Sequence, residues 1–380
     1  STLFPYTTLF RSTTNAINRV DVQEAKKTVR DYAYNISAAI ANAILVTLGM
    51  GLLMQTVAGF VHWQPLFEAG TLAQALLAPA LGLAVASQLE VTTLVTFSTI
   101  ISATVAANAV SFVQTASTAT AIQSVGGAAH PLVVGNAVFS TGQPVSAVAA
   151  ALLAALLGKW LSGKTPLDMV LVPMVVTFVG TFVGFGLASV VTPALTATSA
   201  WIAASIKVNT VLGSMVISPV WALFLMTPAS SAALAVALTL DPISAAAAAI
   251  GTTAQFVGYA AMSWRQNTPG ANIAQFVVTP KVQFPNLILN PWQMVPALVA
   301  AIVCAPLATT LSGLRAAYTV GGLGLNSFIA PIYFWGQGTS QFVAYMLWGI
   351  VMPAVISVFL FQVMKKFGLV KDNQLHLDII

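Results

Sequence analysis

The chain has 380 residues, of which 58% are hydrophobic and 6% are charged, and its mean hydropathy is +0.88. A soluble domain carries roughly 25% charged residues, so this composition excludes a soluble globular protein. A single cysteine excludes a disulfide scaffold and a cysteine-based zinc site. The formal charge of +5, without clustered basic residues, argues against nucleic-acid binding. The class that remains is an all-α, polytopic membrane helix bundle.

Residues 1–12 differ from the rest of the chain. Their sequence, STLFPYTTLFRS, has no helical or strand periodicity and lacks the layout of a signal peptide. From Thr2 to Ser12 it resembles the conceptual translation of a short-read sequencing adapter. We therefore expect residues 1–12 to be an artefact that is foreign to the protein. The alternative is a genuine disordered terminus.

Residues 13–35 form a polar lead-in to the first apolar run. Val20, Ala25 and Val29 recur at near-helical spacing among charged residues. This pattern predicts an amphipathic helix that lies on the inner, cytoplasmic membrane surface. Its basic residues are expected to determine topology rather than to bind a partner.

One membrane crossing needs about 20 apolar residues, so crossings are sought in the uncharged windows of the sequence. These windows predict about ten membrane segments between residues 36 and 364, with eight crossings as the alternative. Several segments are short enough to be broken or half-helices. The predicted segments are residues 36–60, 72–89, 91–113, 144–161, 168–192, 210–226, 228–240, 243–264, 293–313 and 341–364.

Basic residues orient these segments. Arg30 and three other basic residues precede the first segment, and Lys365, Lys366 and Lys371 follow the last one. By the positive-inside rule we expect both ends of the chain to be cytoplasmic, which requires an even number of crossings. Residues 365–380 are then a cytoplasmic tail.

Two glycine-rich stretches interrupt the apolar segments, Ser124–Pro144 and Val320–Gln341. Each is too apolar for an exposed loop and too rich in glycine for a stable helix. In hydrocarbon, such backbone persists only where protein buries it or where it lines an aqueous cavity. Both stretches open with a Gly-Gly pair and share further polar residues. The shared polar residues are Asn136 and Gln143 in the first stretch, and Asn326 and Gln337 in the second.

The likeness of the two stretches predicts two halves that form a pseudo-repeat. Each half would carry a re-entrant segment beside a central substrate site. The alternative is a pair of glycine-rich turns that pack against helices.

Glu90 lies between two apolar segments, ahead of several threonine and serine residues that share one helix face. A carboxylate inside a membrane is costly, so it is a functional candidate by default. It could bind sugar hydroxyls, carry a proton or pair with a buried cation. The alternative is a carboxylate in a short interfacial loop.

His130 precedes Pro131, and its imidazole could bind a polyol or shuttle protons. A histidine that is bound by backbone at a helix end is the alternative. No catalytic residue, metal site or cofactor is expected. The candidate substrate-binding residues are Glu90, His130, Asn136, Gln143, Asn326 and Gln337.

Further amide side chains lie at broken positions of the chain. They suit an uncharged polyhydroxy ligand, and they suit helix caps equally well. They include Asn267, Gln275, Asn286 and Asn290. The scarcity of charge in the core favours a neutral sugar or other polyol over an ionic ligand.

Four stretches resemble the membrane IIC component of the sugar phosphotransferase system. They are SGKTPLDMVLVPMVVTFVGTFVG (162–184), SPVWALFLMTPASSAALAVAL (218–238), GTTAQFVGYAAMSWRQN (251–267) and PNLILNP (285–291). The similarity runs from about residue 40 to residue 365. The chain is most similar to the stand-alone branch that includes perfringolysin-regulator-type proteins.

The resemblance implies a sugar permease of the bacterial inner membrane, which is usually a homodimer. Its IIC-like transmembrane domain would cover residues 36–364. In that family a cytoplasmic IIB protein phosphorylates the sugar as it crosses the lipid bilayer. This chain has no phospho-carrier residue, because Cys304 lies in a membrane segment. Sugar phosphotransferase activity would therefore need IIA and IIB proteins in trans.

The chain lacks the Gly-Ile-Thr-Glu tetrapeptide of glucose-type IIC proteins, so no sugar-binding glutamate is transferred to it. The leading hypothesis is a IIC-type permease for a neutral sugar or polyol. The second is a secondary transporter that couples to protons through Glu90 or His130. The third is a membrane sensor or regulator that binds solute without moving it.

Overall fold

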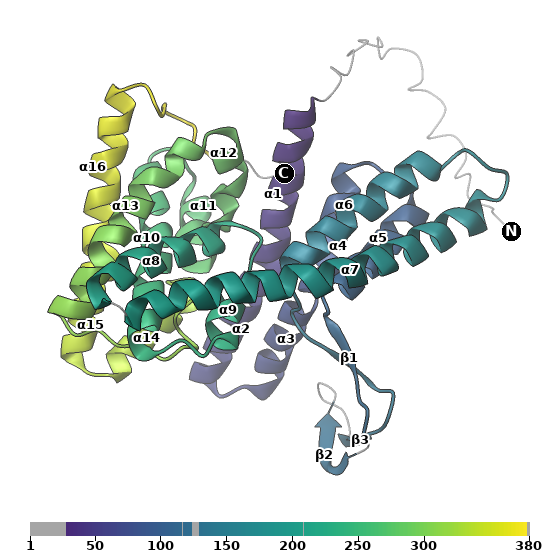
Figure 1. Cartoon of the computed structure of the whole chain (residues 1–380), viewed down its shortest axis with the longest axis horizontal. Helices are drawn as coiled ribbons and strands as arrows, with labels where there is room; N and C mark the ends of the chain where they lie inside the picture. Colours follow the sequence, from purple (N-terminus) through teal and green to yellow (C-terminus); the bar gives the residue numbers. More distant parts are fainter. Residues whose placement is uncertain (1–27, 116, 124–128, 208, 378–380) are drawn as a thin grey trace, which may run out of the picture.

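The structure is a computed structural model that describes residues 28–115, 117–123, 129–207 and 209–377. The expected artefact, 1–12, and most of the lead-in lie outside the described residues. Figure 1 shows a bundle of helices with strands that project from one end. The start of α1 (Val29–Ile44) and the end of α16 (Met352–Lys366) lie at the opposite end of the bundle.

Among the described residues, five helical stretches are long and apolar enough to cross a membrane. A sixth is added if α3 (Gln64–Ala75) and α4 (Leu77–Gln88), which meet at a bend of 48°, form one broken span. The prediction of a multi-pass, all-α membrane bundle is confirmed. The count of ten segments and the pseudo-repeat are not confirmed and stay predictions.

The described part of the first half contains seven α-helices. Thr28 caps α1 through a reciprocal pair of hydrogen bonds with Asp31, and a π-helical turn at Leu45–Gly49 joins α1 to the next helix. The remaining helices of this half are α2 (Met50–Val61), α3, α4, α5 (Thr93–Ala106), α6 (Pro144–Leu161) and α7 (Asp168–Ala204).

Small residues let these helices pack closely, as the alanine-rich sequence predicts. Ala147, Ala151 and Ala155 of α6 are fully buried in the core that α6 shares with α4 and α5. A Cβ built on Gly82 of α4 would lie 2.8 Å from the Ile100 Cα of α5. This first core also holds Leu77, Leu81 and Val85.

The second half forms a separate core around α10 (Pro242–Ser263), which is buried along almost its whole length. Asp241 caps α10 by accepting hydrogen bonds from the backbone N–H groups of Ile243 and Ser244 at 3.0 and 3.1 Å. The other helices are α8 (Thr210–Met226), α9 (Ser231–Ala237), α11 (Pro269–Ile273), α12 (Phe284–Leu289), α13 (Val295–Pro306), α14 (Ile329–Gly336), α15 (Thr339–Tyr345) and α16.

The first glycine-rich stretch forms strands, so the prediction of a re-entrant segment there is wrong for the residues described. It belongs to two antiparallel pairs, β1 (Val110–Phe112) with β4 (Ala137–Phe139) and β2 (Ser117–Gln123) with β3 (Ala129–Leu132). Paired strands satisfy their own backbone hydrogen bonds, so the segment can leave the bundle (Figure 1).

The second glycine-rich stretch stays inside the bundle. Residues 320–328 form turns and a short 3₁₀ helix that precede α14, and most of them are buried. Gly324, Ser327 and Phe328 have φ values of 59°, 51° and 58°. The prediction of non-helical backbone buried within the protein is confirmed for this stretch.

Candidate functional site

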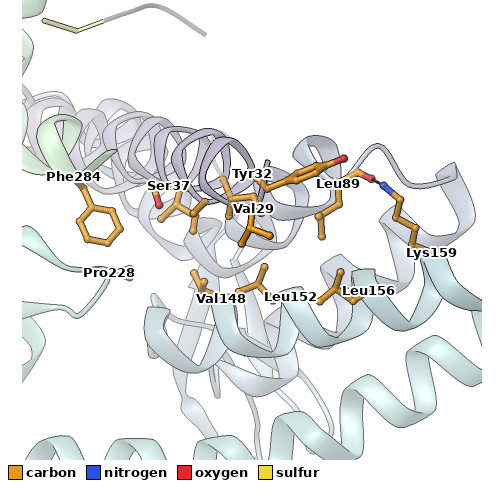
Figure 2. A pocket seen from close by; sticks show the side chains of 13 residues that line it. Val29, Tyr32, Ser37, Leu89, Val148, Leu152, Leu156, Lys159, Pro228 and Phe284 are labelled. Carbon is orange, nitrogen blue, oxygen red and sulfur yellow. Dashed lines mark hydrogen bonds between the residues drawn. The ribbon is translucent and has the colours of Figure 1, made fainter. Parts of the chain in front are cut away.

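Hollows lie between the two halves at several places, and one of them is a large apolar crevice. Figure 2 shows this crevice of about 630 Å³, with Tyr32 and Lys159 at one end and Pro228 and Phe284 at the other. Lys159 is already engaged, because its Nζ donates to the Leu89 carbonyl oxygen at 2.8 Å. The remaining lining is mostly aliphatic, so the crevice offers little to the hydroxyl groups of a sugar.

Another hollow, of about 410 Å³, has a lining of both apolar and polar residues. It is called the central cavity below. The first half contributes residues of the α1–α2 run, of α3 and of the chain after β4. The second half contributes the α8–α9 connection, the turn before α12 and residues 322–326. Its polar lining residues are Gln74, Thr141, Ser230, Ser231, Thr279, Lys281 and Asn326.

The central cavity lies near the middle of the helical run Val29–Val61, which has 33 residues. At 1.5 Å per residue the run is about 50 Å long. The run lines the cavity at Ile44, Leu48, Gly49 and Leu52, which lie between about 22 and 35 Å along it. A cavity with several polar lining residues at this depth, between two halves with separate cores, has the position of a transport site.

Close backbone approach builds one wall of the cavity. Ser231, at the start of α9, donates its hydroxyl hydrogen to the Gly322 carbonyl oxygen at 2.7 Å. A Cβ built on Gly322 would lie 2.3 Å from the Ser231 carbonyl oxygen. Only glycine lets these two segments meet here. The glycine pair of the second stretch therefore has a packing role beside the cavity.

Lys281 is the only charged residue among the described residues that line the central cavity. It lies in the 3₁₀ turn Pro280–Gln283, outside the membrane-spanning helices, and is buried. Its Nζ donates to the carbonyl oxygens of Thr227 and, at 2.8 Å, Ala229. Burial lowers the pKa of this ammonium to about 7.

Two amide side chains from opposite halves line the same cavity with unused hydrogen-bonding capacity. Gln74 of α3 donates to the Gly70 carbonyl oxygen at 3.4 Å, and its own oxygen accepts nothing from the described residues. Asn326 accepts from the Ser327 hydroxyl at 2.7 Å, and its amide nitrogen donates to none of the described residues. Such groups can bind ligand hydroxyls.

Of the six residues predicted from sequence, Asn326 is the one that lines the central cavity. Gln143 caps α6 by accepting a hydrogen bond from Val145 N at 3.4 Å, although its neighbour Thr141 does line the cavity. Asn136 lies in the projecting strand segment, between β3 and β4. Gln337 ends α14 and is exposed.

Glu90 lies in the turn between α4 and α5, is exposed and has φ 53°. This placement matches the alternative of a carboxylate in a short loop. His130 lies in β3, where the structure describes the backbone, and its side chain is outside the described part. Glu90 does not line the central cavity, so a shared site for all six candidates is not formed.

Sequence reasoning missed Lys281 and Gln74. Lys281 is a lone lysine between Pro280 and an apolar run, and this position was a usable signal. Gln74 stands in an ordinary-looking helix, and no local pattern distinguishes it. Its role follows from α3 folding back against α2, where Gly51 and Gly70 meet so closely that a Cβ on either would lie within 2.7 Å of the other's carbonyl oxygen.

The other amide residues fasten the C-terminal tail rather than face the cavity. Asn267 and Gln283 donate to the Leu375 carbonyl oxygen, each at 3.0 Å, and Asn286 donates to the His376 carbonyl oxygen at 2.8 Å. Gln275 joins the same network through Gln283 at 2.9 Å. These amides have a structural role, which was one of the two predicted alternatives.

The family model described as "Phosphotransferase system, EIIC" matches residues 34–377. No curated protein and no solved structure matches the chain. The matched range includes both halves, the central cavity and most of the tail, and the resemblance read from the sequence is confirmed. The chain therefore belongs to the phosphotransferase system EIIC family, whose members are the membrane components of sugar permeases.

Proposed function

We propose that the chain moves a sugar through the central cavity and delivers it to a separate cytoplasmic IIB protein for phosphorylation. The observation that carries this proposal is the placement of Gln74 and Asn326. These two amides come from opposite halves and line one cavity at the middle depth of the bundle. A site shared by two halves can be exposed to either side when the halves move relative to each other.

The distribution of basic residues indicates which face of the bundle is cytoplasmic. Arg30 at the start of α1 donates to the Leu289 carbonyl oxygen at 3.2 Å, and Asn290 donates to the Leu369 carbonyl oxygen at 3.0 Å. The beginning of the bundle and its tail therefore share one face with Lys365 and Lys366. We propose that this basic face is cytoplasmic, in the inner membrane of a bacterium, and that IIB docks on it.

The homodimer stays a prediction of the family resemblance. The large exposed side chains of α7, among them Phe178, Phe182 and Phe185, give it an apolar outer face. Lipid or a second copy of the chain would cover such a face equally well. Disulfide cross-linking of a Phe182→Cys variant in membranes tests the second copy.

Uptake into membrane vesicles tests the proposed function. Vesicles containing the chain are supplied with a panel of radiolabelled sugars, with and without phosphoenolpyruvate and cytosolic extract. Phosphorylated sugar inside the vesicles, formed only with phosphoenolpyruvate, is the expected result. Accumulation of unmodified sugar that an uncoupler abolishes would instead identify the proton-coupled transporter. Binding without any uptake would identify the sensor.

A further inference from the structure

The amine of Lys281 is buried and has no carboxylate partner among the described residues. The residue is 6% exposed, and among the described residues its Nζ donates to the carbonyl oxygens of Thr227 and Ala229. A buried charge of this kind is costly unless an opposite charge compensates it. Burial favours the neutral amine, and an anion beside Lys281 would stabilise the charged form instead.

The position of the ammonium favours a partner inside the central cavity. Two of its three N–H donors are used by the two carbonyl groups, so one remains. Ala229, which accepts one of these hydrogen bonds, lines the cavity together with Pro228, Ser230 and Lys281 itself. The wall that holds the ammonium is thus the wall that a ligand touches.

The rest of the cavity would tolerate an anion. Among the described residues its lining includes no aspartate, glutamate or histidine. Its other polar groups are the amides of Gln74 and Asn326 and a few hydroxyls. These groups bind hydroxyl groups well, and they neither repel nor neutralise a negative charge.

We propose that the ligand of the central cavity is a sugar acid, a polyhydroxy compound with one carboxylate that binds at Lys281. The hydroxyl groups then bind at Gln74 and Asn326. This inference rests on the proposed function, and it replaces the neutral polyol that the scarcity of charge favoured. One carboxylate balances one ammonium, whereas a phosphate dianion would need a second cation.

Matched pairs of probes test this proposal on the unmodified full-length chain in detergent. The pairs are glucuronate with glucose, galacturonate with galactose, and gluconate with glucitol, and binding is measured by thermal unfolding and calorimetry. We expect at least one acid to bind about 10- to 100-fold more tightly than its neutral partner. Equal or weaker binding of all three acids would overturn the proposal.

Variants then assign the preference to Lys281. Lys281→Met removes the charge and keeps the apolar stem, Lys281→Arg keeps the charge, and Lys366→Met is the matched change at an exposed lysine. We expect Lys281→Met alone to lose the preference for the acid while its affinity for the neutral partner changes little. A lysine that only holds the Thr227 and Ala229 carbonyls would weaken both ligands equally, and that result would contradict the assignment.

The two proposals fail in different ways. Phosphoenolpyruvate-dependent uptake of a neutral sugar that Lys281→Met leaves intact would overturn the sugar acid and keep the permease. An acid that binds through Lys281 but is never phosphorylated in the vesicles would keep the site and overturn the permease. If Lys281→Met does not fold, the probe pairs on the unmodified chain still decide.

Discussion

The two glycine-rich stretches have similar sequences and opposite fates. In the first stretch, residues 133–140 are mostly exposed and lie along the projecting strands, and Thr141 beyond them lines the central cavity. In the second stretch, residues 320–328 are mostly buried, and Gly322, Leu323 and Asn326 line that cavity. Gly135 lies in the strand segment, and a Cβ built on it would meet nothing within 4 Å. A Cβ built on Gly322 would collide with the backbone of α9.

Composition thus predicts where helical structure is interrupted, but it does not predict whether the non-helical segment is buried or exposed. Both stretches avoid helical structure because glycine weakens helices. One is kept inside by a neighbour, since Ser231 binds the Gly322 carbonyl group. The other has a pairing partner in the nearby chain, because β1 pairs with β4. Tertiary partners therefore decide which stretch can serve a site.

Replacing one glycine of each stretch with alanine should give the largest difference in uptake between the two stretches. We expect Gly322→Ala to reduce uptake at least about tenfold and to destabilise the protein by about 3 kcal/mol, because the methyl group overpacks against α9. Gly135→Ala should cost about 1–2 kcal/mol, from its φ of 90°, and leave uptake within about twofold. Vesicle uptake and thermal unfolding measure both. Equal uptake by the two variants would contradict the difference.

The asparagines of the two stretches provide the next test. Asn326→Ala should weaken sugar binding about fivefold, which corresponds to one neutral hydrogen bond. Asn136→Ala should leave the affinity unchanged, because Asn136 does not line the cavity. Isothermal calorimetry with the transported sugar compares them. A loss of affinity in Asn136→Ala would place the projecting strands at the site.

Amides of the second half that lie outside the cavity should affect stability instead of affinity. Asn286 donates to the Gln283 side chain and to the His376 carbonyl oxygen, both at 2.8 Å. We expect Asn286→Ala to lower the free energy of unfolding by about 2 kcal/mol, because buried acceptors lose their donors. Denaturant unfolding and calorimetry on the same sample report both quantities. A selective loss of sugar affinity would show that the amide network belongs to the site.

Shortening the projecting strands should have the smallest effect. Val113 exchanges backbone hydrogen bonds with Gly135 and Asn136, so a two-residue Asn-Gly turn can replace residues 114–134. We expect uptake within about twofold of the full-length chain. Removal of transport by this change, with the fold intact by thermal unfolding, would assign the strands a direct role.

Part of this arrangement was predictable from sequence. Hydropathy identified a helical membrane protein, and the four stretches that resemble IIC proteins identified the family. Asn326 was found because it stands in a glycine-rich break. Lys281 and Gln74 were missed, since their value depends on α3 folding back and on the α8–α9 connection accepting the lysine. Such long-range contacts leave no periodic pattern in the chain.

For the amide residues, too, the sequence could not distinguish a binding role from a structural one. Asn267, Asn286 and Asn290 have the chemistry of a sugar site, and the sequence allowed either a ligand or a structural role. Their partners are backbone groups of the tail, at Leu375, His376 and Leu369, about 80 to 110 residues away in the chain. Only the folded tail shows that these side chains are already occupied.

The most direct test of the central claim is protection of a cavity thiol by the transported sugar. Cys304, the only cysteine in the sequence, is buried, so Cys304→Ala provides a background without thiols. Leu323→Cys adds a thiol in the central cavity, and Val138→Cys adds one on the strands. At a sugar concentration ten times Kd, we expect maleimide labelling to slow about tenfold at position 323 and not at 138. Unchanged labelling at position 323 would contradict a sugar site in this cavity.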